Sequence, residues 1–582
     1  MNFTIKAQPA NPACLRLCRR LAVVTSWLVL ASCLQATLVR ADQVAQFFSR
    51  QHYLVEINLD YKAASFTGRE VVRFVNATRE ELDNVSLALY PNSGLAENQE
   101  PWLTVQSVKQ GSRELRFSMR ARGGWIRVEL PKKLLPDQTL ELTLNFAARL
   151  PRVKNEEAGL YAHFLQELSD AVSEERQTVD TRDVFLAGDE VMLLGYFFPM
   201  LIANPMQVGE LGLVAGASGA VFSETADYEV SINAAEDLQV FASGVNAVST
   251  STKLLNLLKI SSRWHTFKAE KLRGFVLVVS ENFKSAEVRV GETRIVSHYR
   301  EADERVGKRL LEMAVRAVEI YEAVFGRYPY PQLQIVEAPL PPGYSGVDLP
   351  GTIALAQAYY IDFDSTQAAR LPGLLREQSD VIRAALEFTL AHGVAQQWWG
   401  GAIGSDPQRA PYVEEALSAF SAAYYHEAAY GVPLGKLVID RQLRGAYHLY
   451  RLFGGGDLEV EKQAKEFRSA LQYAAIVQAK GALWLAALRH ELGDQRFFNA
   501  LRSYYSAYQF QIVPAENLRF AFLAAAEDPR PVRTLTQRWL REKHGDEDIG
   551  LPDAAAFAQP TSKMRSLGRL LMRIGRTAAR PF

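Results

Sequence analysis

Apolar and polar residues alternate along much of the first half of the chain. Apolar side chains recur at every second position in residues 53–59, 85–89, 126–130 and 140–146. A period of two is typical of a strand with one buried and one exposed face. Clusters rich in glycine, proline and asparagine at 91–94 and 122–124 separate these segments and favour turns. Residues 42–285 are therefore predicted to form an antiparallel β domain.

The period changes to that of a helix near residue 301. Val306, Leu310, Ala314 and Ala317 fall on one helical face, and helical patterns continue to about residue 540. Residues 286–545 are therefore predicted to form a mostly helical domain. The expected fold class is a multidomain α+β protein, with the β domain first.

Within the helical region, two neighbouring helices hold the candidate chemistry. One is predicted over residues 379–399 and ends at Gly400–Gly401, and the next starts near Pro411. His392 and Gln396 are four residues apart, so they lie on one face of the first helix. Glu414 and Glu415 stand in the first turn of the second helix. The two helices therefore offer an imidazole, an amide and two carboxylates.

Composition sets wide limits. The chain has 582 residues, is 48% hydrophobic and 22% charged, and has a formal net charge of zero. These values are typical of a globular protein and give no reason to expect a nucleic-acid partner. The three cysteines, Cys14, Cys18 and Cys33, all precede residue 42. The body of the chain therefore has neither a disulfide nor a thiolate metal site.

Both ends of the chain are basic. Residues 1–41 combine Arg19 and Arg20 with a following apolar run. This pattern fits a cleaved signal peptide, a lipoprotein leader modified at Cys33, or a retained membrane anchor, and all three predict an extracytoplasmic, periplasmic or outward-facing body. The C-terminal tail is residues 546–582. Its last part, 563–582, alternates bases with apolar residues and would suit an anionic membrane surface as a helix, or remain a solvated tail.

Residues 392–400, with the sequence HGVAQQWWG, are similar to the H-E-x-x-H-x-W-x-G helix of the aminopeptidase N family. Residues 412–416, YVEEA, resemble that family's W-L-N-E-G. The family separates its second zinc histidine from its zinc glutamate by nineteen positions, which is also the separation of Gln396 and Glu415. Residues 343–351 stand where the family's G-A-M-E-N-W-G strand is expected, and 477–482 resemble its x-Y-E-K-G-A segment. The resemblance implies a saddle-like β domain followed by a thermolysin-like (gluzincin) domain.

The resemblance also implies that the catalytic centre is degenerate. The family's three zinc ligands correspond to His392, Gln396 and Glu415, and an amide is a poor zinc ligand beside imidazole. The general base corresponds to Gly393, which cannot accept a proton from water. The oxyanion tyrosine corresponds to Gln478. No cofactor is expected, although weak zinc binding at His392 and Glu415 is compatible with this pattern.

The expected peptide-binding residues are Gly346, Val347 and Asp348, where Asp348 corresponds to the family's amine-binding glutamate. Asp348 and Glu415 would supply negative charge for an α-amino group. His426 and His490 begin short metal-like motifs that lack a second histidine, so both are interpreted as structural. The triple change Gly393→Glu, Gln396→His and Gln478→Tyr is expected to gain zinc binding.

Three functions are compatible with these features. The first is a pseudo-peptidase that binds a peptide or protein partner outside the cytoplasm. The second is an active zinc aminopeptidase with an atypical site. The third is a scaffold held at a membrane surface by residues 563–582.

Overall fold

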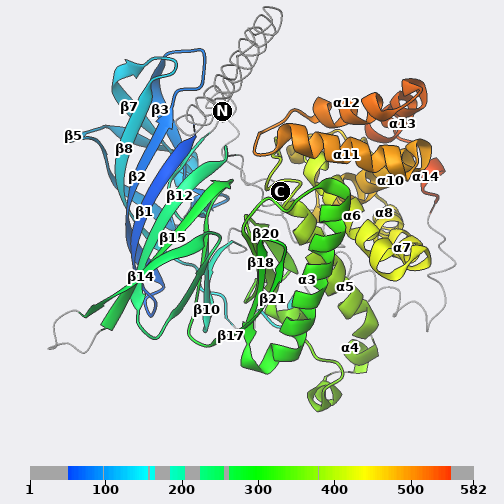
Figure 1. The fold of residues 1–582 in the computed structure, drawn as a ribbon, viewed down its shortest axis with the longest axis horizontal. Coiled ribbons are helices and arrows are strands. Elements are labelled where there is room, and N and C mark those ends of the chain that lie inside the picture. Colours follow the sequence, from blue (N-terminus) through cyan, green and yellow to red (C-terminus); the bar gives the residue numbers. More distant parts are fainter. Residues whose placement is uncertain are drawn as a thin grey trace, which may run out of the picture.

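The structure is a computed structural model that describes residues 50–551, except 96–97, 155–157, 161, 164–183, 203–222, 254–260, 372 and 378. The predicted leader and the basic tail at 563–582 lie outside the described residues. The strands of the β domain form one half of the molecule and the helices form the other, with a smaller sheet between them (Figure 1). The predicted α+β fold class is confirmed.

The β domain is built around a sheet of eight strands. In spatial order these are β14 (Val245–Lys253), β15 (Ser261–Leu272), β12 (Ala226–Ala235), β1 (Gln51–Asp60), β2 (Ser65–Val75), β8 (Thr139–Arg149), β4 (Leu103–Gln110) and β5 (Arg113–Glu114). Tyr53, Val55 and Ile57 of β1 are buried and their neighbours are not, as the alternation predicts. The sheet is antiparallel except for β1 and β12, which pair in parallel.

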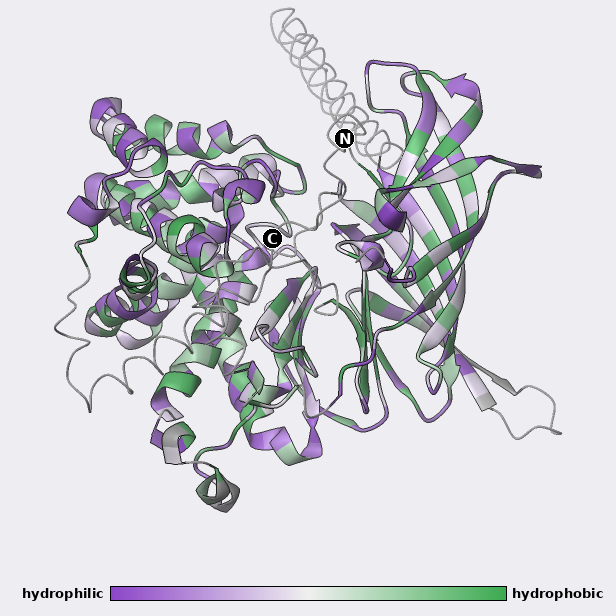
Figure 2. Ribbon diagram, turned by 180° about the vertical axis from the view of Figure 1, so that it is seen from behind, coloured by the Kyte–Doolittle hydropathy of each residue, from purple (hydrophilic) through white to green (hydrophobic). Residues whose placement is uncertain are grey.

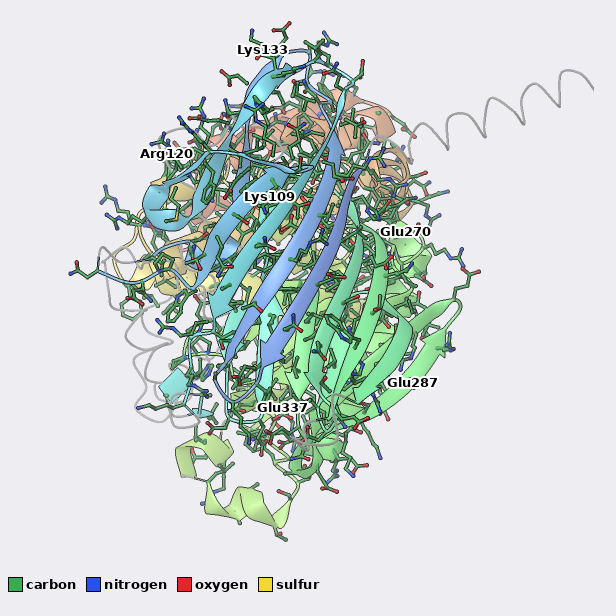
Figure 3. All side chains as sticks on the ribbon, turned by 90° about the vertical axis from the view of Figure 1, so that its left-hand side faces the viewer. Lys109, Arg120, Lys133, Glu270, Glu287 and Glu337 are labelled. Atoms are coloured by element: carbon green, nitrogen blue, oxygen red, sulfur yellow. The ribbon has the colours of Figure 1, made fainter. Side chains whose placement is uncertain are left out.

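Two sheets of four strands complete the β domain. One contains β13 (Gln239–Ala242), β16 (Val276–Ser280), β10 (Val191–Gly195) and β9 (Phe185–Ala187); the other contains β11 (Met200–Leu201), β3 (Leu82–Ala88), β7 (Trp125–Leu134) and β6 (Phe117–Arg120). Hydrophobic and hydrophilic residues alternate along the long strands (Figure 2). Figure 3 faces the large sheet, with Lys109 of β4 on it and Glu287 of β17 (Phe283–Val290) lower on the same side.

The second half contains a five-stranded sheet besides its helices. Its order is β17 (Phe283–Val290), β18 (Thr293–Arg300), β19 (Gln332–Ala338), β21 (Thr352–Ala356) and β20 (Gly346–Leu349). The boundary expected at residue 285 falls inside β17. Every residue of β19 and β21 is buried. The largely apolar run of β21 shows no alternation, as expected for a strand buried on both faces, so the sequence pattern did not separate it from helix. In β19 the buried residues include Gln332, Gln334 and Glu337.

The helices lie on the side of this sheet that faces away from the β domain, and they hold most of the candidate site (Figure 1). They are α3 (Glu304–Phe325), α4 (Gly373–Glu377), α5 (Ser379–Gln396), α6 (Tyr412–Tyr430), α7 (Val432–Val438), α8 (Gly445–Leu452), α9 (Ala470–Tyr473), α10 (Gly481–Leu492), α11 (Asp494–Tyr508), α12 (Ala515–Ala525), α13 (Pro529–Arg541) and α14 (Gly545–Asp548). A π-helical segment, η9 (Ala474–Lys480), joins α9 to α10. Among the described residues, none of the helices is both long and apolar enough to cross a membrane.

The expected helix over residues 379–399 ends earlier than predicted, at Gln396. Trp398 and Trp399 instead form a tight turn, with exposures of 0% and 1%. The indole of Trp398 donates to the carbonyl of Gly326, and that of Trp399 donates to Ser421 Oγ. Gly400 follows with a φ of 134°, which favours glycine and reverses the chain. Burial of the two indoles therefore ends the helix before the glycines do.

Candidate functional site

Four elements bring the predicted site residues together. The helix α5 carries His392 near its end, and α6 carries Glu415 in its first turn. The short strand β20 carries Asp348, and the π-helical segment η9 carries Gln478. Residues that are far apart in the sequence thus meet around one imidazole ring.

His392 lies between two carboxylates. Its Nδ1 atom is 3.4 Å from Asp348 Oδ2, and its Nε2 atom is 3.7 Å from Glu415 Oε2. The exposed fraction of the side chain is 13% for His392, 6% for Asp348 and 0% for Glu415. Charges that are buried to this degree need partners, and here each carboxylate faces one edge of the same ring.

Gln478 is hydrogen-bonded within this group. Its Nε2 atom donates to Glu415 Oε2 over 2.6 Å, and the bond is buried. The same oxygen of Glu415 therefore faces both the amide of Gln478 and the ring of His392. An amide at 478 donates where the family has a phenol, but it donates inward to a carboxylate.

Gly393 makes room for Asp348. A Cβ atom placed on Gly393 would lie 2.3 Å from Asp348 Oδ1 and 3.1 Å from Ile353 Cγ2. The first distance is far below van der Waals contact, so a side chain at 393 and the present position of Asp348 exclude each other. The position that corresponds to the family's general base is therefore next to a carboxylate from β20.

Gln396 does not complete a ligand set with His392 and Glu415. A Cβ atom placed on Gly400 would be only 2.6 Å from Gln396 Oε1, so the amide oxygen lies against the Gly400 turn. Gln396 Nε2 is buried without a hydrogen-bond partner in the structure. Nearby, Glu414 Oε1 accepts hydrogen bonds from the backbone N–H and the Oγ–H of Ser405, and burial raises the pKa of Glu414 to about 7.

Gln397 fastens α5 to the turn after β20, a role that sequence reasoning missed. Its Nε2 atom donates to the carbonyls of Leu349 and Gly393, and its Oε1 accepts the N–H of Gly351 over 2.8 Å. Nothing in the sequence distinguishes this glutamine from Gln396 beside it. Only the path of the β20–β21 turn shows which amide is bound.

Arg273 joins the β domain to the loop after α5 and was also missed. Its guanidinium donates to the carbonyls of Ser223, Gly400 and Gln511, and the residue is 6% exposed. Burial lowers the pKa of Arg273, but a guanidinium stays protonated throughout the physiological range. A single arginine between β15 and β16 carries no sequence signal for such a role.

The two other histidine motifs lie outside the site. His426 is buried in α6 and its Nδ1 atom lies 2.8 Å from the carbonyl of Ala422, one turn earlier. His490 is exposed near the end of α10. Within the described part of the chain, no group of three or more His, Cys, Asp or Glu side chains is placed to hold a metal ion.

The residues present do not fit a catalytic zinc ion. Such a site needs three protein ligands and an open position for water. His392 Nε2 and Glu415 Oε2 face each other, but Gln478 already donates to that oxygen. The third position holds an amide whose oxygen lies against the Gly400 turn. Two donors remain, and one of them is already hydrogen-bonded.

The fold is similar to that of solved metallopeptidases. The M1 zinc metallopeptidase from Deinococcus radiodurans superimposes with a TM-score of 0.55 at 15% sequence identity, and the match covers 87% of this chain and 95% of that one. A point mutant of the same enzyme gives a TM-score of 0.54 at 15% identity, covering 85% and 94%. The architecture is therefore that of the M1 metallopeptidases.

Sequence comparison gives a match over a smaller part of the chain that is consistent with the fold. Aminopeptidase M1-B from Oryza sativa subsp. japonica is 25% identical over 239 residues, which is 41% of this chain and 26% of the rice protein. The match thus spans about a quarter of that relative's length. No protein-family model matches the sequence. The aminopeptidase N-like, M1-type relationship predicted from the motifs is confirmed, and zinc is the metal named for the solved relatives.

Proposed function

We propose that this chain is an aminopeptidase N-like pseudo-peptidase that binds a peptide or protein outside the cytoplasm without hydrolysing it. The observation that carries the proposal is the position of the Asp348 carboxylate, 2.3 Å from where a Cβ of residue 393 would be. Hydrolysis in this family type needs a base at that position to take a proton from water. A glycine shielded by a carboxylate from another strand cannot supply one.

The loss is spread over the whole centre. Gln396 faces the Gly400 turn instead of a metal position, and Gln478 donates to Glu415. Removing a positioned base alone costs about two to four decades in rate, and losing the metal's polarisation of water costs several kcal/mol more. An enzyme with only one of these replacements would be slow but active. The three replacements together, at Gly393, Gln396 and Gln478, support the proposal that the centre does not hydrolyse peptides.

The framework around the centre supports a binding role. The strand β20 is an edge strand of its sheet and, among the described residues, pairs only with β21. It holds Gly346, Val347 and Asp348. An edge strand can bind an extended peptide through its backbone groups, so peptide recognition does not need the catalytic residues. We therefore retain these three residues as the proposed peptide-binding positions.

Metal analysis beside a peptidase assay tests the proposal directly. Purified protein without its leader should contain far less than one zinc per chain, release no product from aminoacyl anilides after zinc is added, and still bind members of a peptide library. The opposite result is zinc at one per chain with anilide cleavage that a chelator abolishes. That result would establish the alternative, an active aminopeptidase with an atypical site.

A second readout tests the membrane scaffold, for which residues 563–582 are the motivating feature. Protein with and without these residues is mixed with vesicles of anionic or neutral lipid, and sedimentation is compared. Unchanged sedimentation after the deletion would reject a role for the tail. The pseudo-peptidase proposal does not depend on this outcome.

A further inference from the structure

The relation between Gly393 and Asp348 goes beyond a missing base. Glycine in the interior of a helix costs about 1 kcal/mol relative to alanine, so its presence in α5 needs a compensating gain. Here a side chain at 393 would displace the Asp348 carboxylate, which contacts His392 at 3.4 Å. The glycine thus permits an interaction between β20 and α5 that an alanine would prevent.

The contacts continue beyond this pair. His392 Nε2 also faces Glu415 of α6 at 3.7 Å, which is within ion-pair range but is not a hydrogen bond. Glu415 accepts a hydrogen bond from the amide of Gln478 of η9 at 2.6 Å. Four elements are thereby joined through one buried set of polar side chains. A zinc ion bound by α5 and α6 would join only those two helices, and would need the Glu415 oxygen that Gln478 now uses.

We propose that Gly393 and Asp348 are a matched pair: the missing side chain lets Asp348 enter a metal-free clasp with His392, Glu415 and Gln478 that holds β20, α5, α6 and η9 together. The clasp takes over the structural role of an ion. It also engages both carboxylates that would otherwise face an α-amino group, so a free amino terminus is not what this centre recognises. This last step rests on the proposed binding function.

A double-mutant cycle on residues 348 and 393 tests the clasp. The four proteins are the natural chain, Gly393→Ala, Asp348→Ala and the double variant, each followed by thermal unfolding. In the natural background, Gly393→Ala should lower the midpoint, by about 2–4 °C for a domain of this size, because the methyl group displaces Asp348. In the Asp348→Ala background, the same change should raise the midpoint because helix propensity then dominates.

The cycle separates the clasp from other causes. Ile353 lies 3.1 Å from the same position, and a clash with it would cost equally in both backgrounds. An equal shift of the midpoint in the two backgrounds, in either direction, would overturn the proposal. Both substitutions are small, and all four proteins retain the rest of the network, so a folded sample is expected for each.

Zinc content gives a second and independent test. The structure revises the expectation from the sequence for the triple change Gly393→Glu, Gln396→His and Gln478→Tyr. Asp348 lies in the path of the new side chain at 393, so this protein should bind zinc poorly. Adding Asp348→Ala should tighten zinc binding by about tenfold or more, the usual scale for groups around a metal's ligands. Equal zinc affinity with and without the fourth change would refute the matched pair.

These outcomes are distinct from those that test the proposed function. If the natural protein is inactive and contains little zinc but the cycle shows no coupling between residues 348 and 393, the pseudo-peptidase proposal stands and the clasp is rejected. If the cycle shows coupling but the protein cleaves anilides, the clasp stands and the pseudo-peptidase proposal is rejected. The claim that the centre does not recognise a free amino terminus has its own test. A peptide that binds and its N-acetylated form should have the same affinity, and a loss of affinity of tenfold or more on acetylation would reject the claim.

Discussion

Gln396 and Gln397 are neighbours at the end of α5, but the structure gives their side chains opposite surroundings. Gln397 makes three hydrogen bonds to the β20–β21 turn and to α5 itself. Gln396 stands at the third ligand position and has a buried amide nitrogen without a partner. The amide of Gln397 is thus hydrogen-bonded at both its oxygen and its nitrogen, whereas the amide nitrogen of Gln396 is not.

The comparison extends to the regions around each residue. The framework includes Arg273 at the domain junction and the buried Lys480, whose ammonium group lies 2.9 Å from Asp457. In the centre, the remaining polar groups turn toward one another around His392. Selection for shape alone would give this contrast, because a binding surface needs its framework but not a metal. Four substitutions probe it, from the largest expected effect to the smallest.

Arg273→Met should be the most damaging change. It removes a buried guanidinium and with it the donor to the carbonyls of Ser223 and Gly400, whereas the carbonyl of Gln511 keeps the N–H of Gly404. Each buried carbonyl left unpaired costs about 1–3 kcal/mol, so a total loss of about 4 kcal/mol is expected in urea unfolding. Arg273→Lys, which keeps one charge, should lose less. A change below about 1 kcal/mol for Arg273→Met would show that the junction does not depend on this residue.

His298 should make the framework sensitive to acid. It lies between Ser285 Oγ and Gln334 Oε1, and burial lowers its pKa from 6.5 to about 3. Because the folded protein resists protonation, His298 costs nothing above pH 6.5, and stability falls as the pH drops from 6.5 toward 3. Between pH 7 and 4.5 the loss attributable to His298 is about 3 kcal/mol. The difference in unfolding free energy between these pH values should shrink in His298→Gln, and an unchanged difference would contradict the assignment.

Gln397→Ala should destabilise the protein by about 2 kcal/mol. The change leaves the N–H of Gly351 and the carbonyl of Leu349 buried without their partner. Chemical denaturation measures the loss, and the turn after β20 should show faster amide hydrogen exchange. A loss confined to global unfolding, without a local effect at the turn, would argue against the anchoring role.

Gln396→Leu should have the smallest effect, within about 0.5 kcal/mol of the natural protein or slightly stabilising. The substitution removes a buried amide nitrogen that has no hydrogen-bond partner and adds apolar surface. Measured beside Gln397→Ala, it is the matched control for position in the helix. If Gln396→Leu proved as costly as Gln397→Ala, the distinction between framework and centre would fail.

Much of the fold could be predicted from residue patterns, and the exceptions have physical causes. Half-buried strands such as β1 and β8 show the alternation that marks them. A fully buried strand such as β21 does not, because largely apolar residues occupy both of its faces. The parallel pairing of β1 with β12 joins segments far apart in the sequence, and alternation says nothing about which strands are neighbours.

The site was predictable where it depends on spacing within a helix and not where it depends on distances between elements. Helical spacing put His392 and Gln396 on one face, and the resemblance brought Glu415 toward them. That Asp348 would lie against Gly393 depends on how closely β20 approaches α5, which no single segment encodes. Gln397 and Arg273 were missed for the same reason, since their partners are backbone carbonyls and amides of distant loops.

The parallel pairing of β1 with β12 has a consequence for how the chain reaches its native state. Gln51 pairs with Ala226, so the earliest described strand must wait for a much later segment before its second edge is covered. Closing so long a loop is entropically costly, and strand pairing over such distances is slow. During synthesis β1 and β2 would therefore present an open sheet edge, and a chaperone that shields this edge should raise the yield of folded protein.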